Sequence, residues 1–129
     1  MNAYEVKGLK VIIAGGGTAG HINPGIAIAR YIKEKDKNSE ILFIGTNKGM
    51  EAQLVPREGF EIKFIKVRGF RRKLSKENLT AIKELIEGIS GSKKIIREFK
   101  PDIVIGTGGY VCGPVVFSAS RMKIPTLIH

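Results

Sequence analysis

The sequence is poor in several features that define large classes of protein. Its 129 residues include one cysteine, no tryptophan, and 12 acidic residues against 22 lysines and arginines. One cysteine excludes an intramolecular disulfide framework and fits a reducing cytoplasm. No apolar run approaches the roughly 18 residues of a spanning helix, and the short run 11–14 leads into glycines, unlike a signal peptide. A single folded domain with 43% hydrophobic residues remains.

Positive charge is abundant, and it is localised. The net charge is +10, and residues 63–100 hold 12 basic and 4 acidic residues, whereas residues 1–62 hold 8 and 7. Such an excess indicates an anionic partner, which is nucleic acid, a phosphorylated ligand or an anionic membrane surface. Three phenylalanines are the only aromatic residues in 63–100, and no helix-turn-helix pattern is present. Nucleic acid is therefore disfavoured as a partner.

Short apolar runs alternate with amphipathic stretches along the chain. We expect strands at 10–14, 40–45, 60–67, 102–107 and 125–129. We expect a helix capped by Asn23 with Pro24 in its first turn, and others at 50–57, 76–99 and 113–122. Gly88 and Gly91 weaken the helix expected at 76–99, which would then be two helices. The alternation predicts an α/β fold, a Rossmann-like doubly wound parallel sheet with strands one and four adjacent.

Two glycine-rich loops follow strands one and four of this predicted sheet. The first, Gly15–Gly20, fits G-x-G-x-x-G between a strand and a helix, and the second runs from Gly108 to Pro114. Parallel strands end at one edge of the sheet, so both loops should line one crevice, where backbone amides and helix N-termini bind phosphate. A dinucleotide (NAD(P)-type) cofactor is the alternative ligand. It is disfavoured because no acid follows the second strand, although Lys48 would suit a 2′-phosphate.

Three side chains in these loops are candidates for a catalytic or binding role. His21, at the start of a helix, suits a neutral general base or a hydrogen-bond donor, and its alternative is a capping or packing role. Tyr110 either contacts a sugar or anchors its loop. Cys112 has no histidine partner in the sequence pattern, so we expect a packing residue rather than a nucleophile. The acids are scattered and histidines number two, so we expect no metal site.

Apolar residues accompany the basic segment. Arg71, Arg72 and Lys73 lie with Phe70 and Leu74, a combination that binds anionic membrane surfaces. A helical stripe follows, made of Leu79, Ile82, Leu85, Ile86 and Ile89. A crossover helix must bury one apolar face on the sheet, so we expect this stripe mainly in the core. The loop 70–74 is therefore the better candidate for membrane contact.

Five segments in combination resemble the MurG family of bacterial glycosyltransferases. They are Gly16–His21 with Asn23-Pro24-Gly25, Ile44-Gly45-Thr46, Met50–Pro56, Lys100-Pro101-Asp102 and Gly108–Pro114. The resemblance covers about residues 10–129. It implies the transfer of N-acetylglucosamine from UDP-N-acetylglucosamine to undecaprenyl-pyrophosphoryl-N-acetylmuramoyl-pentapeptide (lipid I to lipid II) in peptidoglycan synthesis, with inversion and without a cofactor or metal.

The resemblance also implies a domain organisation. Residues 1–129 would be the acceptor-binding, amino-terminal half of a two-domain GT-B enzyme. The family typically continues past His129 with Glu-x-Asn, so we expect a fragment that lacks the donor-binding domain and is inactive alone. The full-length hexosyltransferase would be a peripheral protein on the cytoplasmic face of the cell membrane, with no nucleic-acid partner.

Site residues follow from the resemblance by position. His21 matches the proposed base for the acceptor C4 hydroxyl, and His129 matches a cleft-lining histidine. The acceptor diphosphate would lie between two sets of loop residues: Thr18, Ala19, Gly20 and Gly108, Gly109, Tyr110. The donor would contact Gly17, Thr18 and Ala19. The membrane patch would comprise Phe70, Arg71, Arg72, Lys73, Leu74 and Lys76. Ala19 stands where glycine is more usual, and Cys112 where serine or cysteine is found.

Overall fold

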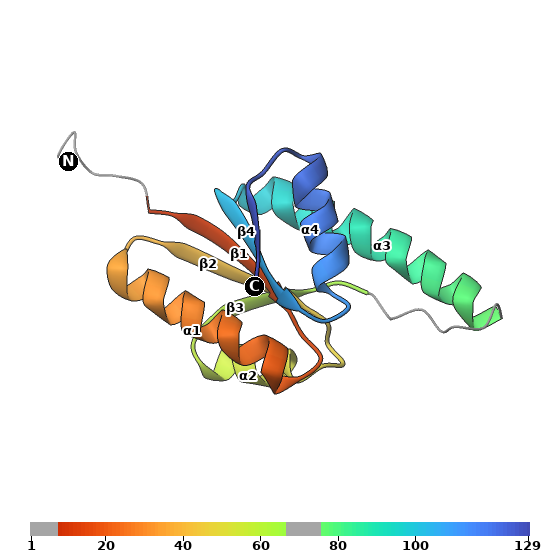
Figure 1. The fold of residues 1–129 in the computed structure, drawn as a ribbon, viewed down its shortest axis with the longest axis horizontal. Coiled ribbons are helices and arrows are strands. Elements are labelled where there is room, and N and C mark those ends of the chain that lie inside the picture. Colours follow the sequence, from red (N-terminus) through yellow and green to blue (C-terminus); the bar gives the residue numbers. More distant parts are fainter. Residues whose placement is uncertain (1–7, 67–75) are drawn as a thin grey trace.

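The computed structural model describes residues 8–66 and 76–129, and it shows a single parallel sheet between two helical layers (Figure 1). The elements in chain order are β1 (Lys10–Gly15), α1 (Ala19–Lys35), β2 (Glu40–Gly45), α2 (Glu51–Arg57), β3 (Glu61–Phe64), α3 (Lys76–Phe99), β4 (Ile103–Gly108), α4 (Cys112–Arg121) and β5 (Thr126–Ile128). The strand order is β3-β2-β1-β4-β5. The predicted α/β class, and the pairing of β1 with β4, are confirmed.

The central strand β1 is apolar on both faces because helices cover both sides of the sheet. Val11 and Ile13 pack with α1 and α2 side chains such as Ile26 and Val55. Ile12 and Ala14 face the opposite way and pack with residues of α3 and α4. The winding reverses between β1 and β4, since the chain moves outward through β2 and β3 and then returns across the sheet by α3. Such a switch point is where doubly wound sheets bind ligands.

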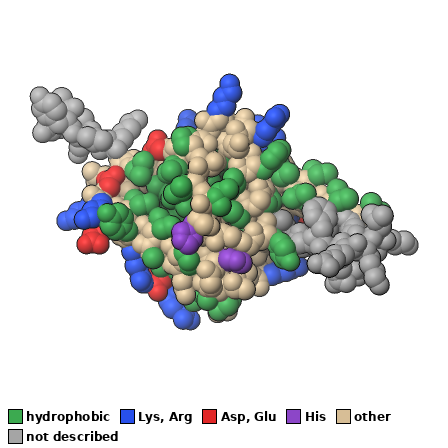
Figure 2. Space-filling model, viewed as in Figure 1, with side chains coloured by type: hydrophobic (Ala, Val, Ile, Leu, Met, Phe, Trp, Pro, Cys, Tyr) green, Lys and Arg blue, Asp and Glu red, His purple; other side chains and the backbone are tan. Residues whose placement is uncertain are grey.

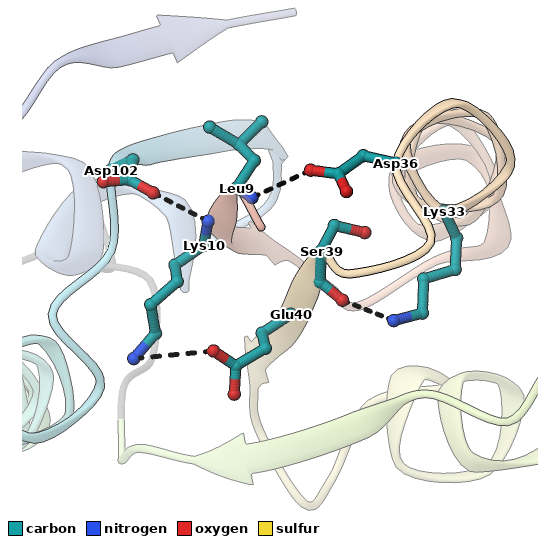
Figure 3. Close-up of polar contacts among 7 residues, drawn as sticks. All are labelled: Leu9, Lys10, Lys33, Asp36, Ser39, Glu40 and Asp102. Carbon is teal, nitrogen blue, oxygen red and sulfur yellow. Dashed lines mark hydrogen bonds and ion pairs between the residues drawn. The ribbon is translucent and has the colours of Figure 1, made fainter. Parts of the chain in front are cut away.

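Acidic residues hold the amino-terminal edge of the sheet (Figure 3). Asp36 accepts a hydrogen bond from the Leu9 amide at 2.9 Å, and Asp102 accepts one from the Lys10 amide at 2.8 Å. The Lys10 ammonium pairs with Glu40 at 3.8 Å. These contacts fix the start of β1, opposite the edge where the glycine loops emerge.

The first helix begins earlier than the sequence predicts. Thr18 is extended, with φ −122° and ψ 157°, and its carbonyl accepts hydrogen bonds from the amides of His21 and Ile22. This first turn closes before Asn23, so the predicted cap at Asn23 is wrong and Pro24 lies inside α1. Proline has no N–H to donate to the carbonyl of Gly20, one turn back, so α1 lacks one internal hydrogen bond there.

The long helix α3 is continuous through Gly88 and Gly91, so the predicted division into two helices is wrong. A Cβ on Gly88 would lie 2.6 Å from the Lys66 carbonyl oxygen, so glycine permits close packing of the helix on the chain after β3. The Ser118 hydroxyl of α4 also donates to the Ile89 carbonyl at 3.3 Å. Tertiary contacts therefore offset the low helical propensity of the two glycines.

The amino-terminal half of α3 extends beyond the sheet (Figure 1). Leu79, Ile82 and Ile86 are exposed there, and Leu79 keeps 68% of its surface. The expectation that this stripe lies mainly in the core is wrong for these three residues, because this end of α3 extends past the strands and helices of the described residues. Residues Phe70–Leu74 fall outside the described part of the chain, and Lys76 is described only as the first residue of α3.

Basic side chains lie around the margin of the face of the molecule that Figure 2 shows. In Figure 2 the lysine and arginine side chains on this face gather at its margins, while histidine and hydrophobic side chains occupy its centre. None of the helices in the described part of the chain combines the length and apolarity needed to cross a membrane.

Candidate functional site

The two glycine loops meet at the carboxyl-terminal edge of β1 and β4. The Gly16 amide donates to the Gly108 carbonyl at 3.2 Å. The β1–β4 register shifts just before this point, so that Gly15 pairs with Gly108. A Cβ on Gly109 would lie 2.4 Å from the Gly16 carbonyl oxygen, and Gly109 also has a φ of +91°. Only glycine satisfies both requirements at this position.

Several amides at this junction have no acceptor in the described structure. They belong to Thr18, Ala19 and Gly20 at the start of α1, and to Gly109 and Tyr110 before α4. Helix N-termini present such unpaired N–H groups together with the positive end of the helix dipole. The junction therefore offers donors from two helix ends to an anion. The Gly17 amide differs from these, because it already donates to Glu51 at 3.0 Å.

His21 is the third residue of α1, and its ring lies against the second loop. A Cβ on Gly108 would lie 2.6 Å from the ring carbon Cδ2, so glycine leaves the space that the ring occupies. The ring atom Nδ1 lies 3.2 Å from the Gly16 carbonyl oxygen and 3.4 Å from the Thr18 hydroxyl. A carbonyl only accepts hydrogen bonds, so the contact with Gly16 favours the tautomer that carries a proton on Nδ1. In that tautomer Nε2 is the ring nitrogen with a free lone pair.

Glu51 is the residue of the site that the sequence analysis missed. Its side chain is 1% exposed. It accepts hydrogen bonds from the Gly17 amide, from the Thr46 amide at 2.8 Å and from the Thr46 hydroxyl at 3.3 Å. An acid beside apolar residues in a short helix resembles any surface acid. Its signals in the sequence were its place in the Met50–Pro56 segment and the glycines at 16, 45 and 49, which surround the carboxylate in space.

Tyr110 and Glu51 border a small cavity beside the junction. The cavity has a volume of about 60 Å³, and Gly16, Gly17, Thr46 and Val111 complete its lining. Tyr110 keeps 72% of its surface and Val111 is buried, so the tyrosine is free to contact a ligand while its neighbour anchors the loop.

Two further predicted residues lie near the junction without joining it. The His129 amide donates to the Gly106 carbonyl at 2.9 Å, which places its backbone beside the end of β4. Its exposed side chain makes no hydrogen bond within the described residues. The Cys112 sulfur packs against Gly106, where an added Cβ would lie only 2.3 Å from it. This contact agrees with the expected packing role.

The structure also bears on the alternative ligands. After β2, where a dinucleotide site needs an acidic residue free for the ribose, the Thr46 amide and hydroxyl bind Glu51 instead. Within residues 8–66 and 76–129, no three His, Cys, Asp or Glu side chains gather closely enough to hold a metal ion.

Comparisons with known proteins find relatives of this chain. A curated protein of Acetivibrio thermocellus is 70% identical over 121 residues, and one of Ruminiclostridium cellulolyticum is 60% identical over the same length. Both are named UDP-N-acetylglucosamine–N-acetylmuramyl-(pentapeptide) pyrophosphoryl-undecaprenol N-acetylglucosamine transferase. Each match covers 94% of this chain, and the chain spans about a third of each relative, 33%.

A solved structure and a family model also match this chain. The crystal structure of Acinetobacter baumannii MurG superimposes with a TM-score of 0.79 at 29% identity, over 94% of this chain and 34% of that one. The resemblance to MurG is thereby confirmed, and the dinucleotide alternative is less well supported. The model of the glycosyltransferase family 28 N-terminal domain matches residues 11–129. The chain therefore belongs to the glycosyltransferase family 28 N-terminal domain family.

Proposed function

We propose that this chain is the acceptor-binding domain of an inverting hexosyltransferase. The full protein would move N-acetylglucosamine from UDP-N-acetylglucosamine to undecaprenyl-pyrophosphoryl-N-acetylmuramoyl-pentapeptide. The relatives that are 60% and 70% identical carry this activity in their names. One observation in this chain supports the proposal most directly. Two helix ends with unpaired amides converge beside a histidine whose Nδ1 lies against the Gly16 carbonyl oxygen, a contact that favours a free lone pair on Nε2.

The junction divides the work of such a transfer between backbone and side chain. The amides of Thr18–Gly20 and of Gly109–Tyr110 would bind the acceptor diphosphate without a lysine or arginine. Nε2 of His21 would accept the proton of the attacking C4 hydroxyl, which then displaces UDP from the sugar. The donor would contact Gly17 through its carbonyl or Cα, because the Gly17 N–H binds Glu51 in this conformation.

His21→Ala tests this function in a hybrid enzyme. In the hybrid, this chain replaces the corresponding third of the Acetivibrio thermocellus relative, and labelled sugar transfer to the lipid acceptor is measured. Loss of a general base should lower kcat about 10²- to 10⁴-fold. Tyr31→Ala is the matched control, since Tyr31 is an exposed residue of the same helix, three turns beyond His21. A His21→Ala hybrid as fast as the unmodified hybrid would remove the base from the mechanism.

We further propose that α3 holds the domain on the cytoplasmic face of an anionic membrane. Leu79, Ile82 and Ile86 form an exposed apolar row at helical spacing, and Lys83 lies within it. The chain's excess of basic residues falls in the same segment, 63–100. Exposed apolar and basic residues together bind anionic lipid. The predicted Phe70–Leu74 segment precedes this row, and a lipid-linked acceptor would be presented at such a surface.

Vesicle co-sedimentation measures this membrane contact. Leu79→Ser with Ile86→Ser should reduce the bound fraction on vesicles that contain phosphatidylserine, because both side chains are exposed and carry little of the core. Tyr31→Ala controls for loss of any exposed apolar residue. Arg71, Arg72 and Lys73 replaced by glutamate should abolish the preference for anionic over neutral vesicles. If neither set of changes alters binding, the basic segment does not contact the membrane.

A further inference from the structure

We propose that Glu51 is a positioning residue that orients His21 through the peptide group between Gly16 and Gly17. This peptide group is bound at both ends. Its carbonyl oxygen, from Gly16, accepts the hydrogen bond of His21 Nδ1 at 3.2 Å. Its N–H, from Gly17, donates to Glu51 Oε1 at 3.0 Å. The catalytic meaning of this arrangement rests on the function proposed above, whereas its effect on the histidine ring does not.

A single planar unit therefore connects the carboxylate with the imidazole. The peptide group is rigid, and its carbonyl and N–H point in opposite directions. Fixing the N–H on Glu51 consequently fixes the direction of the carbonyl toward His21. A peptide between two glycines has little intrinsic conformational preference, and Gly17 has a φ of +89°. Without the carboxylate, nothing else among the described residues binds the Gly17 N–H.

The carboxylate is itself firmly held. Oε2 accepts hydrogen bonds from the amide and the hydroxyl of Thr46. Three glycines enclose the carboxylate, and a Cβ on each would lie 2.0 Å (Gly16), 2.4 Å (Gly45) or 1.9 Å (Gly49) from the nearest Glu51 atom. None of these three has a positive φ. Glycine is therefore required at these positions for space, and the space is filled by Glu51.

This arrangement determines which nitrogen of His21 is free. All three partners of Glu51 are donors, which suits an ionised carboxylate. An ionised acceptor on the N–H polarises the peptide and strengthens its carbonyl as an acceptor. The carbonyl then retains the proton on Nδ1 and leaves Nε2 able to accept one. A carboxylate that orients a histidine directly is the arrangement of hydrolase triads, and here a peptide group lies between the two.

Nitrogen-15 NMR of the imidazoles distinguishes this role from a merely structural one. In the unmodified chain His21 should be mainly the Nδ1–H tautomer, and the exposed His129 provides an internal reference. Glu51→Gln should shift the His21 tautomer ratio toward that of His129, and Glu51→Asp should give an intermediate ratio. Asp102→Asn is the matched control. Asp102 also accepts a backbone N–H, that of Lys10, but at the opposite edge of the sheet (Figure 3).

Two results would overturn the proposal. The first is a predominant Nε2–H tautomer of His21 in the unmodified chain, a measurement that needs no variant. The second is an unchanged His21 ratio in folded Glu51→Gln or Glu51→Asp. If Glu51→Gln does not fold, Glu51→Asp and the unmodified chain still decide the question.

Kinetics of the hybrid enzyme add a separate readout. Glu51→Gln should lower kcat at least about tenfold, because misplacing a catalytic group by ~1 Å costs up to 10²-fold. The KM for UDP-N-acetylglucosamine should change less than kcat falls, although Gly17, which Glu51 holds, also meets the donor, since the base acts only in the transition state. A normal kcat would contradict the positioning role. A shifted tautomer in a chain that supports no sugar transfer would instead refute the proposed function alone.

Discussion

Gly45→Ala tests whether the glycines around Glu51 serve to make room for its carboxylate. Gly45 is buried at the end of β2 and has no positive φ, so alanine suits its backbone. The added Cβ would lie 2.4 Å from Glu51 Cγ and 2.9 Å from Oε2. Carbon atoms in contact need about 3.5–4.0 Å, so the carboxylate must move by roughly 1 Å or more.

The expected cost has two parts. Overpacking a well-filled interior costs about 1–3 kcal/mol. A displaced carboxylate also weakens hydrogen bonds to a charged group, and these are worth ~1.5–3 kcal/mol each. Glu51 accepts three such bonds, and we take the displaced carboxylate to lose one of them. We expect a loss of about 3 kcal/mol in the free energy of unfolding. For a domain of this size, that corresponds to a fall of ~10 °C in Tm.

A double-mutant cycle by urea unfolding separates this clash from general damage. In a Glu51→Ala background the space is vacated, so Gly45→Ala should cost less than about 1 kcal/mol. The coupling energy would then be about 2 kcal/mol. Gly113→Ala is the matched control, because a Cβ at Gly113 meets no atom within 4 Å. If Gly45→Ala costs the same in both backgrounds, Glu51 is not what excludes a side chain at position 45.

The two glycines of α3 give opposite predictions. Gly91→Ala should raise the free energy of unfolding by about 0.5–1 kcal/mol, since alanine favours the helix and its nearest neighbour, Ile65 Cγ2, would be at an ordinary 3.4 Å. Gly88→Ala should lower it by about 1–3 kcal/mol, because its Cβ would lie 2.6 Å from the Lys66 carbonyl oxygen, a backbone atom that moves little. Thermal unfolding followed by circular dichroism measures both, and equal effects would show that helical propensity alone governs these positions.

Much of the fold could be predicted because local patterns determine it. The apolar runs 11–14 and 41–44 are typical of strands in a sheet that is covered on both faces, and both runs are buried in the structure. Their alternation with amphipathic stretches then leaves a parallel sheet as the arrangement that covers both faces. The position of the glycine loops followed from topology, since parallel strands end at one edge. The predictions failed where one contact outweighed a local preference, as at Asn23, where the Thr18 carbonyl had already started α1.

The sequence by itself therefore determined the sheet, its switch point, the two loops and the family resemblance carried by their residues. Only the tertiary structure decided that the first loop is bound to Glu51, because that contact joins residues 34 positions apart. It also decided that Leu79, Ile82 and Ile86 are exposed, since their apolar spacing is equally typical of a buried helix face. The spacing of residue types along the chain shows which side chains are apolar or charged. Which partner each of them contacts depends on the packing between helices and strands, which the local sequence does not encode.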